Sequence, residues 1–228
     1  ETALKLCRHW GYLVKKIPGN KARIVVCSGN FHGRTLGVIS FSTDPSAKKD
    51  FGPYLPGFDV IPYNDLPALA AALKDENVAG FLVEPIQGEA GVVVPDDGYL
   101  SIAKQYCADA NVLFIADEIQ TGLCRTGRLL CCDHENVRPD ILILGKALSG
   151  GVLPVSAVLA AEEVMLSLKP VEHGTPSGGN TFACKVATTS FKILKDYNMA
   201  YIEGTKCHTR CSHRAYCVPR PRRRARQH

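Results

Sequence analysis

Two apolar stretches of the sequence run into residues that could do chemistry together. Asp117 and Glu118 stand near the end of the segment VLFIADEI (112–119), and Lys146 lies near the end of DILILGKAL (140–148). A lysine amine that loses its proton through partial burial attacks carbonyl groups and forms Schiff bases. A buried aspartate can pair with the protonated ring nitrogen of pyridoxal phosphate. The two residues are the minimum equipment for that cofactor, although strands that simply reach the surface would also explain them.

The spacing around Lys146 excludes a nucleotide site of the P-loop type. Such a loop would need Gly at position 140 and Ser or Thr at 147, where the chain has Asp140 and Ala147. No GxGxxG motif follows the first apolar segment, so a dinucleotide site is unsupported. We expect no metal site, because the histidines are widely separated in the sequence, at positions 32, 134 and 173.

Short apolar segments alternate with helical patterns along most of the chain, which predicts an α/β fold. Segments rich in Val, Ile and Leu on both faces predict buried strands at 23–29, 58–63, 79–86, 112–119, 140–148 and 154–160. Amphipathic patterns and capping signals predict helices at 1–16, 65–75, 97–110 and 182–197.

The predicted sheet is mostly parallel and covered by helices on both faces. In open sheets of this kind, ligands bind beyond the carboxyl ends of the strands. Glu84, Asp117 and Lys146 are all predicted to lie at such ends. This common edge is therefore where we expect the functional site.

The last part of the sequence differs sharply in composition. Eight of the 27 Lys and Arg residues and none of the 22 acids follow Gly204, so the part before it carries a net charge of −3. We expect residues 1–200 to form one domain and 201–228 to be a disordered, solvated basic tail. The arginine run could instead bind nucleic acid or an anionic surface. The tail's Cys and His residues lack a CxxC pair, so zinc is only weakly indicated at Cys207, His208, Cys211, His213 and Cys217.

The remaining sequence features indicate no membrane segment and a reducing compartment. No apolar run reaches the roughly 18 residues of a membrane span. The opening ETALKLCRHWGYLVKK is amphipathic rather than a signal peptide, and we expect the sequence to be a fragment. Seven Cys residues lie in apolar segments, where free Cys behaves as a small hydrophobe: Cys7, Cys27, Cys107, Cys124, Cys131, Cys132 and Cys184.

Five separated motifs occur along residues 1–200. They are NFHGRTLG, FGPYLPGFDVIPYNDLPAL, VEPIQGEAGVVVPDDGYL, FIADEIQTGLCRTGR with RPDILILGKALSGG, and EHGTPSGGN. Together, in this order, they resemble the class III (ω-amino acid) aminotransferases, and within that family the members that act on ornithine. The resemblance implies the large domain of a fold-type I pyridoxal-phosphate transferase, incomplete in this sequence.

The resemblance implies roles for individual residues around the cofactor. Lys146 would bind the cofactor covalently and then move protons between substrate and cofactor. Asp117 would pair with the pyridine nitrogen, Phe31 would stack on the ring, and Gln120 would hydrogen-bond the ring oxygen. A core phenylalanine and a helix-capping glutamine are the plain alternatives for Phe31 and Gln120.

Four further residues receive roles from the same resemblance. Arg34 would bind a substrate carboxylate, for which a planar guanidinium is well suited. Glu89 would pair with an arginine of the C-terminal domain and switch between the two substrates, and Glu84 would support the site from behind. The family's phosphate-binding Thr aligns with Pro176, which offers neither a hydroxyl nor an N–H, so Thr175 is the candidate replacement.

The implied reaction moves the δ-amino group of L-ornithine to 2-oxoglutarate, giving glutamate-5-semialdehyde and glutamate. The implied partners are amino acid and 2-oxo acid substrates and a second subunit of a homodimer, without nucleic acid or membrane. The implied location is the mitochondrial matrix, with the cytoplasm as the alternative. An aminotransferase acting on acetylornithine or 4-aminobutyrate, or a non-catalytic truncated product, stays open. We expect the 228-residue chain alone to be unstable, with little or no turnover.

Overall fold

A computed structural model describes residues 1–200 of the 228-residue chain. The predictions for the tail at 201–228, including its Cys and His residues and its arginine run, lie outside the described residues. Within residues 1–200 the chain folds around one six-stranded sheet with strand order β2-β1-β3-β4-β5-β6. The strands are β1 (Arg23–Cys27), β2 (Phe58–Ile61), β3 (Val78–Val83), β4 (Leu113–Asp117), β5 (Ile141–Leu144) and β6 (Ala157–Ala160).

The first five strands are parallel, and β6 runs antiparallel along β5. All six lie within segments that the sequence predicted as strands, allowing for a residue at one end, so the predicted α/β architecture is confirmed. The prediction of complete burial is wrong for the two edge strands, β2 and β6, where Val60 and Leu159 are each 47% exposed.

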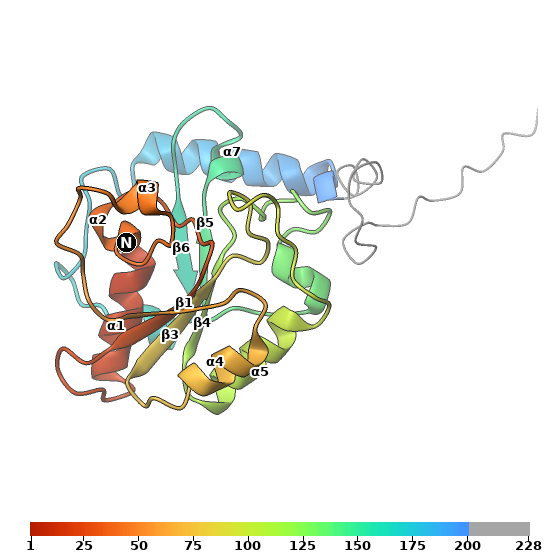
Figure 1. Ribbon diagram of the computed structural model, residues 1–228. Helices are drawn as coiled ribbons and strands as arrows, with labels where there is room; N and C mark the ends of the chain where they lie inside the picture. Colours follow the sequence, from red (N-terminus) through yellow and green to blue (C-terminus); the bar gives the residue numbers. More distant parts are fainter. Residues whose placement is uncertain (201–228) are drawn as a thin grey trace, which may run out of the picture.

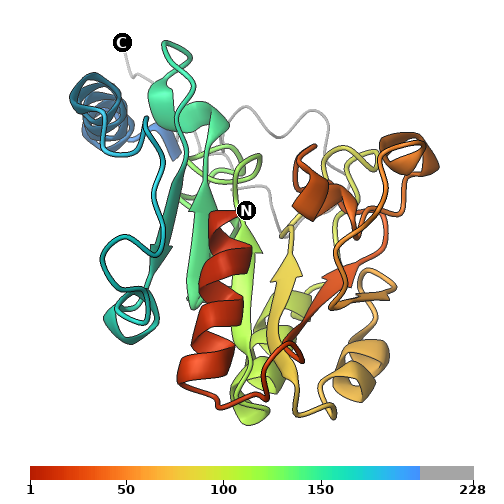
Figure 2. The same cartoon turned by 90° about the vertical axis from the view of Figure 1, so that its left-hand side faces the viewer.

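Helices cover both faces of the sheet, as Figures 1 and 2 show for α1 on one side and α4 and α5 on the other. The longer helices are α1 (Thr2–Leu13), α4 (Leu66–Ala72), α5 (Tyr99–Asp109) and α7 (Thr181–Asp196). All four were predicted. The shorter ones, which sequence patterns did not predict, are α2 (Leu36–Ile39), α3 (Pro45–Lys48), α6 (Glu162–Met165) and the 3-10 helices η1 (Cys131–Glu135) and η2 (Lys146–Ser149).

Alternate residues of the central strands face the two helical layers, because side chains point to opposite faces along a strand. Leu113 and Ile115 pack with α1, whereas Phe114 and Ala116 pack with α4 and α5. Both layers are buried, which explains why these strands read as continuous apolar runs. Six of the seven cysteines of this region are buried as predicted, and Cys184 on α7 is exposed.

The predicted N-cap residues form capping hydrogen bonds at the starts of two helices. The Asp65 side chain accepts a hydrogen bond from Ala68 N at 2.8 Å at the start of α4. Asn180 Oδ1 accepts one from Ala183 N at 3.0 Å at the start of α7. Each satisfies a backbone donor that the first helical turn leaves unpaired. No helix of residues 1–200 is long and apolar enough to cross a membrane.

Candidate active site

The carboxyl ends of β3, β4 and β5 bring three predicted site residues together. Glu84 directly follows β3, Asp117 ends β4, and Lys146 lies two residues beyond β5. The register places Val83 beside Ala116, and Asp117 beside Ile143. A cavity of about 110 Å³ opens at this edge and is lined by Phe31, His32, Gly33, Glu84, Asp117, Ile119, Gln120 and Lys146.

Asp117 is buried at this cavity, with its side chain 6% exposed. Its Oδ2 accepts a hydrogen bond from His32 Nδ1 at 2.7 Å, and its Oδ1 accepts one from Ile119 N at 3.1 Å. Two donors thus fix the orientation of the carboxylate. A charged acid held in this way can receive a hydrogen bond from a cationic ring nitrogen in the cavity.

Lys146 is exposed rather than buried, so the prediction that it lies in a core segment is wrong. The strand ends at Leu144, and the chain turns through Gly145 into η2, with Lys146 in the left-handed region at φ 42°. Few non-glycine residues adopt this conformation, and those that do are often found at functional sites. The turn directs the amine towards Gln120, whose Oε1 accepts a hydrogen bond from Lys146 Nζ at 2.7 Å.

Gly88 leaves the space that the Gln120 side chain occupies. A Cβ built at Gly88 would lie 2.6 Å from Gln120 Cδ, far inside a normal contact distance. Any larger side chain at position 88 would therefore push the Gln120 amide away. Because that amide binds Lys146, Gly88 helps to set the position of the lysine.

Glu84 is a second buried acid at the cavity, with 6% exposure. Its Oε2 accepts a hydrogen bond from Phe31 N at 3.0 Å. Burial, with a smaller contribution from the neighbouring charges of Asp117 and Glu89, raises the pKa of Glu84 to about 7, and His32 opposes the shift. The carboxyl thus joins β3 to the loop that carries Phe31.

Phe31 lines the cavity, whereas three other residues predicted for the site do not. Arg34 is exposed, with its guanidinium 5.5 Å from the centroid of the Phe31 ring. Glu89 and Thr175 are exposed and are absent from the lining. The roles predicted for these three involve substrates or a second subunit, and they stay predictions.

Sequence reasoning missed two residues of this region. His32 was discounted as a lone histidine far from the others, yet its side chain is 3% exposed and bonded to Asp117. Glu118 was treated as a strand-end acid, although it is 1% exposed and accepts three hydrogen bonds, from Thr121 Oγ1 and from the backbone N–H groups of Cys131 and Cys132. The one available signal was position: His32 follows Phe31 in NFHG, and Glu118 follows Asp117.

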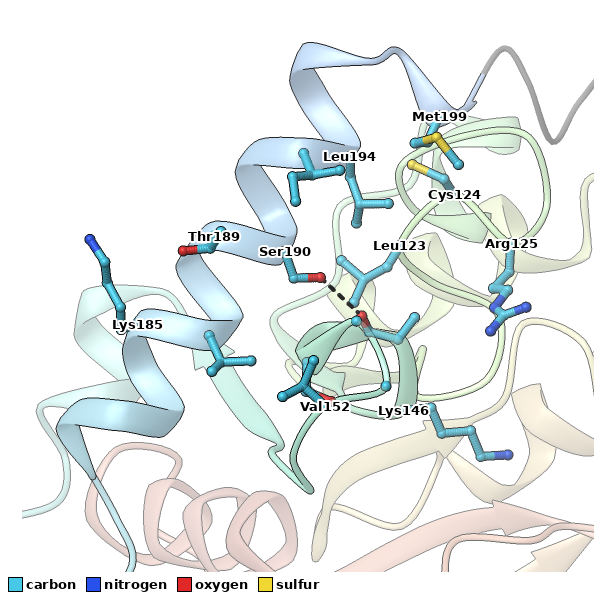
Figure 3. Close-up of a pocket in the computed structure, with 16 residues that line it drawn as sticks. Leu123, Cys124, Arg125, Lys146, Val152, Lys185, Thr189, Ser190, Leu194 and Met199 are labelled. Atoms are coloured by element: carbon cyan, nitrogen blue, oxygen red, sulfur yellow. Dashed lines mark hydrogen bonds between the residues drawn. The ribbon is translucent and has the colours of Figure 1, made fainter.

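A larger open pocket of about 730 Å³ lies beside the cavity, between η2 and α7. Ser190 Oγ of α7 donates to Ala147 O of η2 at 3.5 Å, shown as a dashed line in Figure 3. Apolar residues such as Leu123, Val152 and Leu194 form much of the pocket wall. Figure 3 shows Lys146 extending away from α7.

Known proteins with similar sequences and structures match most of this chain. The aminotransferase class-III family matches residues 1–205. Mitochondrial ornithine aminotransferase of Rattus norvegicus is 60% identical over 200 residues, covering 88% of this chain and 46% of the rat protein. The crystal structure of ornithine aminotransferase from Toxoplasma gondii ME49 superposes with a TM-score of 0.88 at 53% identity, covering 90% of this chain and 48% of that one. Another structure of the Toxoplasma gondii enzyme has PLP at partial occupancy in its active site.

Acetylornithine aminotransferase from Elizabethkingia anophelis is a further structural neighbour. Its TM-score is 0.78 at 53% identity, with 90% of this chain and 50% of that one covered. The chain belongs to the class III aminotransferase family. It spans about half the length of the relatives that it matches.

Proposed function

We propose that this chain carries the cofactor-binding part of a pyridoxal-phosphate-dependent aminotransferase that moves the δ-amino group of L-ornithine to 2-oxoglutarate. The products would be glutamate-5-semialdehyde and glutamate. The arrangement of Lys146 and Asp117 at one cavity, on neighbouring strand ends, is the observation that carries the proposal. The names of the rat and Toxoplasma gondii relatives support ornithine as the amino donor.

The residues at the cavity fit pyridoxal phosphate by their chemistry. Lys146 offers an exposed amine for a carbonyl carbon, and Asp117 offers a buried carboxylate for a ring N–H. Phe31 supplies an aromatic face, and the amide of Gln120 supplies a hydrogen-bond donor to a ring oxygen. Among residues 1–200 no group of His, Cys, Asp and Glu gathers in a way that could hold a metal ion.

When bound, the cofactor supplies an electron sink for the charge that develops as a substrate carbon loses its proton. The chain's own residues would position the cofactor and transfer the proton. Lys146 would hold the cofactor through its amine and, once released by substrate, would take a proton from the reacting carbon and return it. Gln120 keeps that amine at the cavity by accepting its hydrogen bond. Asp117 would keep the ring nitrogen protonated, because a buried carboxylate stabilises a neighbouring cation.

Substrate binding would involve exposed residues beside the cavity. Arg34 packs on the Phe31 ring and would bind a substrate carboxylate through its two-pronged guanidinium. Glu89 would control which of the two substrates is accepted, and Glu84 would hold the Phe31 backbone in place. Thr175, exposed and outside the cavity, would reach the cofactor phosphate of a second subunit in a homodimer. A mitochondrial matrix location is part of the proposal, and the word mitochondrial in the rat relative's name supports the organelle.

Acetylornithine is the second candidate amino donor. The Elizabethkingia anophelis enzyme of that name is as similar in identity to this chain as the Toxoplasma gondii ornithine aminotransferase. The two donors differ at one amine, which is free in ornithine and acylated in acetylornithine.

A chimera tests the proposed donor. Residues 1–200 would replace the matching segment of the rat relative, and glutamate formation from 2-oxoglutarate would be measured with either donor. We expect turnover with ornithine, little with acetylornithine, and none after Lys146→Ala. A folded chimera that prefers acetylornithine would transfer the assignment to that substrate. One that binds the cofactor but turns over neither donor would contradict the proposal.

A further inference from the structure

His32 connects the loop after β1 to the functional end of β4. Its Nδ1 lies 2.7 Å from Asp117 Oδ2, and the two side chains are 3% and 6% exposed. Asp117 in its charged form has no proton to give, so His32 Nδ1 is the donor of this hydrogen bond. The other ring nitrogen, Nε2, is buried without a hydrogen-bond partner among the described residues. Among the described residues, Asp117 is therefore the hydrogen-bond partner of the imidazole.

The surrounding loop holds the imidazole in this position. Asn30, which is buried, donates to Cys27 O at 2.5 Å and to Phe41 O at 3.3 Å. Phe31 N donates to Glu84, and the His32 ring packs against the Phe41 ring at a centroid distance of 5.8 Å. These contacts precede and follow the imidazole in the chain, so its direction is set by the fold before any ligand binds.

The imidazole forms a hydrogen bond with one of the two buried acids that line the same cavity. Asp117 accepts the His32 hydrogen bond, whereas the Glu84 carboxylate accepts only a backbone N–H among the bonds of the described residues. Burial also raises the pKa of Glu84. The charged and titratable groups that line the cavities adjoining His32 are Glu1 on the α1 side, Glu84 after β3, Asp117 on β4 and Lys146 after β5.

We propose that His32 is a positioning residue that holds the Asp117 carboxylate aimed into the cavity. This rests on the proposed function, in which Asp117 meets the ring nitrogen of pyridoxal phosphate. His32 would not touch the substrate. Its Nδ1–H bond would hold Asp117, rather than Glu84, in position for the ring nitrogen. Removal of the donor would free the Asp117 carboxylate to turn and weaken its hold on a cationic ring.

Two substitutions at His32 separate this role from simple packing. His32→Asn keeps a donor close to the Nδ1 position, whereas His32→Leu keeps bulk without a donor. Binding of pyridoxal phosphate to the 228-residue chain would be followed by absorbance over a pH series. We expect His32→Leu to weaken binding roughly tenfold or more, the loss of one charge-assisted hydrogen bond. We expect His32→Asn to stay within about threefold of the unsubstituted chain.

The pH series gives a readout that loss of packing would not move. In His32→Leu, the pH at which the bound cofactor's absorbance changes should shift by about one unit or more, because Asp117 holds the ring proton less strongly. Equal binding and equal pH profiles for the Leu variant and the unsubstituted chain would overturn the inference. If the unsubstituted chain is folded by circular dichroism and takes up no cofactor, the proposed function fails and the inference with it.

A measurement without cofactor completes the test and does not depend on the Leu variant folding. Nitrogen NMR of histidine-labelled chain reports which ring nitrogen of His32 carries the proton, with His32→Asn identifying the signal. We expect a proton on Nδ1, and a clear change of that signal in Asp117→Asn. A His32 protonated only on Nε2, with no response to Asp117→Asn, would contradict the proposal.

Discussion

Glu118 holds the two ends of the segment after β4 together, and its removal should destabilise the fold strongly. The side chain is 1% exposed. Its Oε2 accepts hydrogen bonds from Thr121 Oγ1 at 2.5 Å and Cys131 N at 3.0 Å, and its Oε1 accepts one from Cys132 N at 2.8 Å. Cys131 and Cys132 are themselves 0% exposed, so water cannot replace a lost acceptor.

The size of the effect follows from the number of donors left without a partner. Glu118→Ala strands two buried N–H groups and one hydroxyl, each costing about 1–3 kcal/mol. Burial raises the pKa of Glu118, which shows that the charge itself is unfavourable there and offsets part of this loss. We therefore expect a net loss of about 3–5 kcal/mol, as for other broken buried charge networks. Glu118→Gln keeps one oxygen and places an NH₂ against the Cys132 N–H, so about 1–3 kcal/mol is expected.

Urea unfolding followed by circular dichroism measures both losses through the midpoint at constant slope. Glu163→Gln, an exposed acid in α6, is the matched control and should change the free energy of unfolding by less than about 0.5 kcal/mol. A Glu118→Ala midpoint equal to that of the unsubstituted chain would refute the reasoning.

Two further predictions concern the residues behind the cavity. Burial raises the pKa of Glu84 to about 7, so the buried carboxyl costs stability as the pH rises from about 4.5 to 7. Relative to the unsubstituted chain, Glu84→Gln should therefore gain up to about 3 kcal/mol in free energy of unfolding between pH 5 and pH 8. Parallel pH profiles of the two chains in urea unfolding would contradict this. Gly88→Ala should displace the Gln120 amide and slow cofactor uptake by Lys146 with little change in the unfolding midpoint, whereas Gly19→Ala, with open space around its Cβ, should change neither.

The sheet could be predicted from the sequence because both of its faces are covered. Burial on both sides selects Val, Ile and Leu at successive positions, as in Val78–Val83, and such a run needs no tertiary information to recognise. The same rule failed at Lys146, because the apolar residues beyond Leu144 belong to a 3-10 turn that packs under α7 rather than to the strand. Gly145 is the single residue between β5 and η2, and one residue leaves no separate pattern.

The site could be predicted only where a residue type carries its own chemistry. A lysine and an aspartate at strand ends suggest a cofactor, since the topology brings those ends together. His32 and Glu118 act through partners that are distant in sequence, His32 on Asp117 85 positions away and Glu118 on the backbone of Cys131 and Cys132. Hydrogen bonds of this kind depend on the folded geometry, which spacing in one sequence does not specify.

The central claim is that Lys146 and Asp117, from neighbouring strand ends, hold one cofactor between them. Borohydride reduction of the chain after incubation with pyridoxal phosphate, followed by peptide mass spectrometry, tests it most directly. The account predicts that the label falls on Lys146 and that Asp117→Asn strongly reduces it while the chain stays folded. Label on other lysines only, or full labelling of Lys146 in the Asp117→Asn variant, would contradict it.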